Sequence, residues 1–216
     1  MPIDVSSSAK RIVEAIEVKL RESLPGYEAQ KRMEPSVRAD LLGNTLPNQA
    51  TRKSAVLILL YPADFGLNFV LIKRQTYDGP HSGQVSLPGG KFDDTDQTLD
   101  GTALRETYEE VGIEPGQVRL LGRLTELYIP VSNMVVQPFV GFTPQKPVFT
   151  PNLQEVEYIV KVPLTDLLAE ANKSVRVISS HGRAITAPHY NLNNEIIWGA
   201  TAMILSEFEE VVRMSL

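Results

Sequence analysis

Residues 83–113, GQVSLPGGKFDDTDQTLDGTALRETYEEVGI, decide how this 216-residue chain folds and what it can bind. The segment passes from a glycine turn, 87-LPGG-90, through an acidic loop into a predicted helix. In that helix Glu106, Glu109 and Glu110 are spaced i, i+3, i+4, which places them on one face about 5–6 Å apart. Such carboxylates repel one another, and a hard cation relieves the repulsion. The spacing therefore indicates a divalent-cation site, although three glutamates alone more often form a solvated face.

The limits of this helix follow from its own residues. Leu104, Tyr108 and Val111 recur at spacings of four and three, so we expect them to form the apolar face opposite the glutamates. Gly112 follows as a C-terminal stop. Before the helix, Gly90 brings the backbone close to a ligand, and its carbonyl could complete a metal shell.

The segment resembles the signature of the Nudix hydrolases: a glycine, then an acidic residue, then REUxEExGU with U aliphatic. Residues 105–113, RETYEEVGI, match the second half, with Thr107 in place of an aliphatic residue. The stretch between the glycine pair and Arg105 is one residue longer than usual. Counting forward from the glycines puts the acidic position at Asp96, and counting back from Arg105 gives Gln97. We favour Asp96, with a one-residue insertion.

The longer spacing also occurs in the coenzyme A pyrophosphatase branch of the family, whose upstream motif has the form LLTxRSxxLRxHxGxVxFPGG. Asp78 and Gly79 replace the Leu-Arg pair of that motif. Residues 152–164 resemble its NxxEV...VPL strand, and residues 197–202 its IWGxTA helix start, in which we expect Trp198 to pack in the core. The upstream positions that fit in register are Leu71, Arg74, His81, Gly83, Val85, Pro88, Gly89 and Gly90.

The resemblance implies an α/β fold (α+β in the broad sense), a Nudix-type α/β/α sandwich with a mixed central sheet. We expect a Nudix domain at residues 52–216, preceded at residues 1–51 by a helix and an irregular connector. Periodicity and turn residues predict the elements. These are helices at 9–24, 164–170 and 199–214, a hairpin of strands 55–61 and 68–73, strands at 117–127, 134–142 and 156–162, and a hairpin from 175 to 190.

The resemblance also implies metal-assisted hydrolysis of a diphosphate linkage. Glu106, Glu109 and Glu110, with the Gly90 carbonyl, would hold Mg²⁺ or Mn²⁺. Arg105 would orient the glutamates through a bidentate contact with Glu109 or with the acidic loop at Asp96. We therefore place Glu109 and Arg105 among the catalytic residues.

A general base and substrate contacts complete this predicted site. Glu155, within the NxxEV match, is the first candidate for the base, and Glu157 is the second. Arg74, His81 and the glycines at 89 and 90 are the candidate substrate contacts. Arg74 could equally be a surface charge, and His81 a hydrogen-bonded loop residue.

The expected substrate is a nucleoside-diphosphate derivative, most plausibly coenzyme A or an acyl-CoA. ADP-ribose, NADH and dinucleotides are alternatives, as is a non-catalytic ligand-binding or regulatory module with the same fold. The net charge of −5 argues against a broad nucleic-acid surface. No apolar run approaches the roughly 20 residues of a membrane span, and cysteine is absent, so we expect a cytoplasmic protein. A homodimer is left open.

Overall fold

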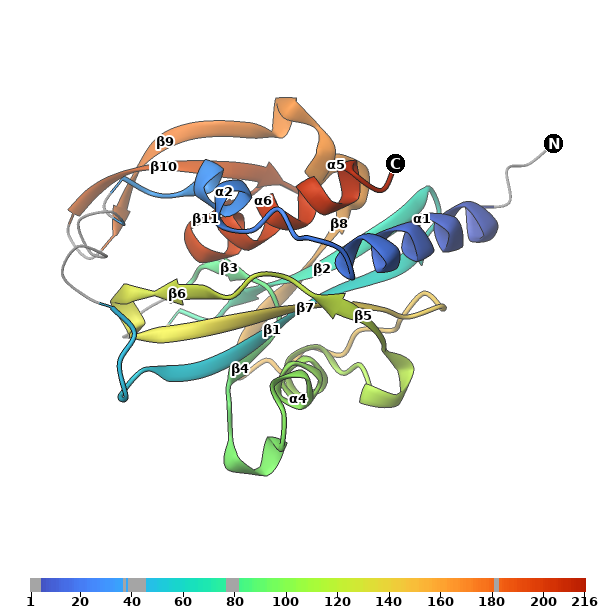
Figure 1. Cartoon of the computed structure of the whole chain (residues 1–216), viewed down its shortest axis with the longest axis horizontal. Coiled ribbons are helices and arrows are strands. Elements are labelled where there is room, and N and C mark those ends of the chain that lie inside the picture. The colour runs from blue at the N-terminus through green and yellow to red at the C-terminus, as the bar shows by residue number, and fades with distance from the viewer. Residues whose placement is uncertain (1–4, 37, 39–45, 77–81, 181–182) are drawn as a thin grey trace.

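The computed structural model describes residues 5–36, 38, 46–76, 82–180 and 183–216. Two sheets and their helices form layers, with α4 (Leu99–Val111) below the central sheet and α1 (Val5–Leu20) and α6 (Gly199–Arg213) above it (Figure 1). Two shorter helices are α2 (Tyr27–Gln30) and α5 (Leu164–Leu168). Single 3₁₀ turns lie at Lys31–Met33, Asp94–Asp96, Pro115–Gln117, Pro130–Ser132 and Glu170–Asn172.

The described strands form a central sheet of eight and a second sheet of three. The central strands are β1 (Arg52–Ala63), β2 (Gly66–Arg74), β3 (Val85–Ser86), β4 (Gly89–Lys91), β5 (Arg119–Arg123), β6 (Leu127–Ile129), β7 (Met134–Phe142) and β8 (Val156–Pro163). The second sheet contains β9 (Lys173–Ser180), β10 (Arg183–Leu192) and β11 (Glu195–Trp198). β1 runs parallel to β7 and antiparallel to β2 and β4, so the predicted mixed sheet is confirmed.

Each face of the central sheet has its own core. On one face, α4 packs on β1 through side chains that include Ala103, Val111 and Leu57. On the other face, α1 and α6 share a larger cluster that includes Ile16 and Phe208. Burial on both faces explains why β1 and β2 read as nearly continuous apolar runs, and it confirms the α/β/α sandwich.

The N-terminal helix belongs to the same core as the predicted domain. Its apolar stripe, Ala9, Val13, Ile16 and Leu20, is buried. The helix covers Val5–Leu20, four residues earlier than predicted. The described part of the connector is also more regular than expected, because α2 and the following turn pack against α6. The boundary at residue 51 stays a prediction, and one core extends across it.

The prediction of a single strand at residues 117–127 was wrong, because the structure has two strands there, β5 and β6, with a break between them. Both β5 and β6 pair with β7, and the break lies opposite Pro138. Proline has no amide hydrogen to give to a neighbouring strand. The side chain of Gln137 donates to the Leu124 carbonyl at 2.8 Å instead. The hairpin of β1 and β2 was predicted correctly.

The apolar face predicted for α4 needs a correction. Tyr108 is 45% exposed, and the buried face is formed by Ala103, Thr107 and Val111. Tyr108 follows Thr107 by one residue, which turns its side chain by about 100° around the helix. The Thr107 hydroxyl donates to the Ala103 carbonyl at 2.6 Å, so the residue that departs from the Nudix signature is buried with its donor satisfied.

A buried carboxylate joins three distant segments on the other face. Glu207 of α6 is fully buried and accepts hydrogen bonds from the backbone amides of Gly26 and Thr125. It also accepts from the Thr125 hydroxyl at 2.7 Å and from the Gln30 side-chain amide at 2.8 Å. A single side chain thus anchors the α2 segment and the β5–β6 connection to α6.

Glu207→Ala should destabilise the protein by about 3 kcal/mol, because it leaves several buried donors without an acceptor. Chemical denaturation would measure the loss. Glu14→Ala, at an exposed position of α1, is the control and should change the free energy of unfolding by less than about 0.5 kcal/mol. Similar values for the two variants would show that Glu207 is not an anchor.

Candidate functional site

The glycine turn lies directly against the acidic face of α4. A Cβ added to Gly90 would come 2.3 Å from the Glu106 carboxyl carbon. At Gly89 φ is 147°, and a Cβ there would come 2.3 Å from the Ala55 carbonyl oxygen. Side chains at these two positions would therefore separate the turn from the helix or from β1.

Glu110 is the most buried of the three predicted glutamate ligands, at 1% exposure. Its carboxylate accepts the Gly89 backbone amide at 2.8 Å and lies 3.5 Å from the Arg74 guanidinium. Burial nevertheless raises the pKa of Glu110 to about 7, against the opposing effects of Arg74 and the Gly89 amide. The negative charge of nearby Glu106 raises it further. A cation bound next to Glu110 would favour its ionised form and so oppose the effects of burial and of the Glu106 charge on its pKa.

Glu106 lies beside Glu110 and is also partly removed from water. Burial raises its pKa, and the Arg105 guanidinium, 3.0 Å from its carboxylate, acts in the opposite direction. Glu109 is more exposed, with 47% of its side chain accessible, and its carboxylate pairs with Arg105 at 2.9 Å. The acidic face thus has a buried end at Glu110 and an open end at Glu109.

Arg105 holds the helix to the acidic loop. Its guanidinium contacts Asp96 through two nitrogens, at 2.6 and 3.0 Å, and reaches Glu109 through the third. It also donates to the Lys91 carbonyl. The hydrogen bonds from Arg105 hold the pKa of Asp96 well below its usual range. Arg105 thus contacts both partners that the sequence suggested, Glu109 and Asp96. The choice of Asp96 over Gln97 for the acidic position of the signature stays a prediction, which this contact supports.

The sequence reasoning missed the residues that hold Asp96 in place. The Thr102 hydroxyl donates to Asp96 at 2.8 Å. Asp93 and Asp96 form a capping box around the short 3₁₀ turn between them. The pair of acidic residues three positions apart was a signal for this box, because a side chain at each end can accept from the backbone of the other.

Glu155 lies near the acidic face although it follows Glu110 by 45 residues in the sequence. Its charge raises the pKa of both Glu106 and Glu110. The backbone places it there: the Gln75 amide donates to the Glu155 carbonyl at 2.9 Å, and the Asn152 amide donates to the Glu110 carbonyl at 3.1 Å. The roles of Glu155 and of Glu157 as base candidates stay predictions, and the position of Glu155 supports the first.

The candidate substrate contacts have different outcomes. Arg74 is engaged within the protein, since it donates to the Gly89 carbonyl at 3.2 Å and the Ser86 hydroxyl at 3.1 Å while facing Glu110. Its phosphate contact stays a prediction. His81 and the Asp78-Gly79 substitution lie outside the described residues.

The acidic side chains fit a hard divalent cation by their chemistry. The Gly90 backbone lies close to the Glu106 carboxylate, and carboxylate and carbonyl oxygens are the donors that Mg²⁺ and Mn²⁺ prefer. Among the described residues no three acidic or histidine side chains already form a closed ligand group. One reason is that Arg105 draws Glu109 and Glu106 towards itself. These carboxylates would turn towards a bound cation.

An α/β/α sandwich in which a glycine pair lies against an acidic helix defines the structural class of this protein. The family model described as NUDIX domain matches residues 51–179. The chain therefore belongs to the Nudix hydrolase family.

Two relatives agree with this assignment, and one solved structure shares the fold. The chain is 34% identical over 168 residues to Nudix hydrolase 22, chloroplastic, of Arabidopsis thaliana, covering 74% of this chain and 55% of that protein. It thus spans about half the length of such plant relatives. It is 35% identical over 165 residues to an uncharacterized Nudix hydrolase NudL of Yersinia pestis, covering 74% of this chain and 80% of the relative. A MutT/nudix family protein from Enterococcus faecalis shares the fold, with a TM-score of 0.53 at 17% identity, covering 82% of this chain and 68% of that one.

Glu110→Gln should stabilise the metal-free protein at high pH. The folded-state pKa of Glu110 is about 7 and its ordinary value is 4.5, so the protonated carboxyl favours the fold below about pH 4.5 and this contribution is lost as pH rises through 7. The neutral amide keeps an acceptor for Gly89 without the buried charge. Thermal unfolding in a chelator at pH 5 and pH 8 would measure the effect.

The Tm difference between Glu110→Gln and the parent should be larger at pH 8 than at pH 5. Glu114→Gln, at an exposed position beyond the helix, is the control and should show the same difference at both pH values. An equal difference for Glu110→Gln would contradict the raised pKa.

Proposed function

We propose that this protein is a divalent-metal-dependent pyrophosphohydrolase that cleaves the diphosphate linkage of a nucleoside-diphosphate derivative. The observation that carries the proposal is that Glu106 and Glu110 both lie against the glycine turn, at Gly90 and Gly89 respectively, while the charge of Glu155 acts on both. These groups come from a helix, a turn and a distant loop. A merely solvated acidic face would not include a glutamate that is 1% exposed.

The residues divide into ligands and groups that position them. Glu106, Glu109, Glu110 and the Gly90 carbonyl would hold Mg²⁺ or Mn²⁺, which would neutralise phosphate charge and lower the pKa of an attacking water. Arg105 keeps the helix and the acidic loop in register through Asp96. Glu155 would accept a proton from the water, because its charge acts on Glu106 and Glu110 and the residue is exposed to solvent.

The substrate proposal is narrower. Coenzyme A or an acyl-CoA is favoured by the upstream motif around Arg74, and ADP-ribose, NADH and dinucleotides are the alternatives. In the described part of the chain no helix is long and apolar enough to cross a bilayer. A small soluble nucleotide derivative is the partner that the acidic site suits best once it holds cations. The cytoplasmic location and the homodimer stay predictions.

A ligand-binding module without turnover is the second candidate. It would share the fold, but it has no need of a buried carboxylate that stays costly to ionise. The retention of all three glutamates with Glu155 therefore favours an enzyme.

A hydrolysis screen tests the proposed function. Coenzyme A, ADP-ribose, NADH and dinucleoside polyphosphates would each be supplied with Mg²⁺ or Mn²⁺, and we expect coenzyme A among the best. Glu109→Gln should lower the rate by about 100-fold or more because a metal ligand is lost, without unfolding the protein. Glu114→Gln is the control and should keep the rate. Normal hydrolysis by Glu109→Gln would reject the site, whereas much faster cleavage of ADP-ribose would reject only the coenzyme A assignment.

Gly90→Ala gives a separate test of the metal ligands. The new methyl group would come within 2.3 Å of the Glu106 carboxyl carbon, so this carboxylate must move. The metal concentration for half-maximal activity should rise by about tenfold or more. Gly116→Ala, where a Cβ meets nothing within 4 Å, is the control. An unchanged metal dependence would exclude the Glu106–Gly90 pair from the metal site.

A further inference from the structure

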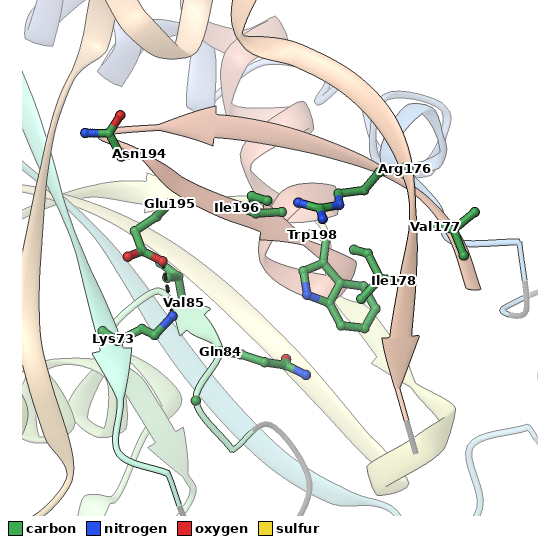
Figure 2. Close-up of a pocket in the computed structure, with 11 residues that line it drawn as sticks. Lys73, Gln84, Val85, Arg176, Val177, Ile178, Asn194, Glu195, Ile196 and Trp198 are labelled. Atoms are coloured by element: carbon green, nitrogen blue, oxygen red, sulfur yellow. Dashed lines mark hydrogen bonds and ion pairs between the residues drawn. The ribbon is translucent and has the colours of Figure 1, made fainter. Parts of the chain in front are cut away.

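A cavity of about 410 Å³ lies where the second sheet meets β2 and β3 of the central sheet (Figure 2). Part of its wall comes from residues within the matched NUDIX domain, which include Lys73, Val85 and Arg176. The rest comes from β11 and the turn before it, beyond residue 179 where that match ends. The cavity is therefore formed jointly by the family domain and the C-terminal part of this chain.

One wall of the cavity offers an aromatic surface. Trp198, which the sequence analysis placed in the core, is only partly buried and lines the cavity with Ile178 and Val85. The indole ring belongs to the single tryptophan of the chain. Such a partly exposed ring between aliphatic side chains suits a planar heterocycle, which gains stacking and leaves its polar edge in water.

Within the described part of the chain, the cavity also carries one cation without an ion-pair partner. Among the described residues no carboxylate lies within ion-pair distance of Arg176, and its side chain is exposed. The other cation, Lys73, is already paired with Glu195 at 3.1 Å, and the Tyr158 hydroxyl also donates to Glu195. Figure 2 shows Arg176 and Trp198 on one side of the cavity and the Lys73–Glu195 pair on the other. An anionic group on a ligand would meet Arg176 first.

The cavity is close to the acidic site along two strands. Lys73 lines the cavity, and the next residue, Arg74, contacts Glu110. Val85 also lines the cavity, and Gly89, four residues later, donates to Glu110. The Cα atoms of Val85 and Gly89 are therefore at most about 14 Å apart. Consecutive strand residues point to opposite sides, so a ligand in both places must bend round the end of β2. A flexible diphosphate ester can do so.

We propose that this cavity binds the nucleoside moiety of the substrate, with its base stacked on Trp198 and a phosphate paired with Arg176. The assignment rests on the proposed function only in placing the scissile diphosphate at α4. Binding of the nucleoside moiety is a separate property. It can be measured without metal and without turnover.

Fluorescence of Trp198 gives that measurement, because no other tryptophan contributes. The full chain in a chelator would be titrated with AMP and with ribose 5-phosphate. AMP should produce a saturable change in the emission, and ribose 5-phosphate, which lacks the base, should produce none. Absence of a saturable change with AMP, or an equal change with ribose 5-phosphate, would overturn the proposal.

Arg176→Ala tests the phosphate contact at an exposed position where folding is not at risk. It should weaken AMP binding by about tenfold, the value of a charge-assisted hydrogen bond. Arg123→Ala is the matched control, on β5 at the opposite end of the sheet order from β3, and should bind AMP as the parent does. Equal affinities for Arg176→Ala and the parent would remove the arginine from the site.

Kinetics on the hydrolysed substrate separate this proposal from the proposed function. Trp198→Leu should raise KM with little change in kcat, and Trp198→Phe, which keeps a ring, should restore most of the affinity. If neither change affects hydrolysis, the proposed nucleoside site is wrong, and the proposed function is not contradicted. AMP binding without hydrolysis of any diphosphate would sink the proposed function and leave the nucleoside site standing.

Discussion

The close approach of the Gly89-Gly90 backbone to α4 is the contact on which the acidic site depends. The Gly89 amide donates to Glu110, while Gly90 leaves no room for a side chain beside Glu106. Strand β4, which contains both glycines, pairs with β1, so the turn is fixed to the centre of the sheet. The two most buried carboxylates of the helix, Glu106 and Glu110, are thereby held where burial and repulsion from nearby carboxylates raise their pKa values. A cation that relieved the repulsion would favour their ionised forms.

Arg105 makes its ion pairs at the exposed end of the acidic face. It stabilises the ionised form of Asp96 and pairs with Glu109. The pKa of Glu110 is set mainly by burial. Glu110 instead faces Arg74, whose guanidinium is shared with the Gly89 carbonyl. Two arginines thus hold opposite ends of one acidic face.

Much of this site could be predicted from local sequence, because i, i+3, i+4 spacing and a glycine pair have the same consequences in any helix and turn. The partnership of Arg105 with Asp96 followed from the motif. The exposure of Tyr108 did not, because it depends on which helix face β1 meets. The break between β5 and β6 required knowing that Pro138 would lie opposite it. Glu207 and its partners gave no local signal, since they come together only in the folded chain.

The fold continues beyond residue 179, where the family match ends, and most of the second sheet lies in this later part. Residues beyond 179 supply α6, whose buried Phe208 belongs to the larger core, and β11, which carries Trp198. This part of the chain therefore stabilises the sandwich on one side and presents an aromatic wall on the other. The acidic helix and glycine turn form one site, and the cavity walls form another on the opposite side of β2. Under the two proposals, selection among nucleotide derivatives depends on the second sheet, and cleavage depends on α4.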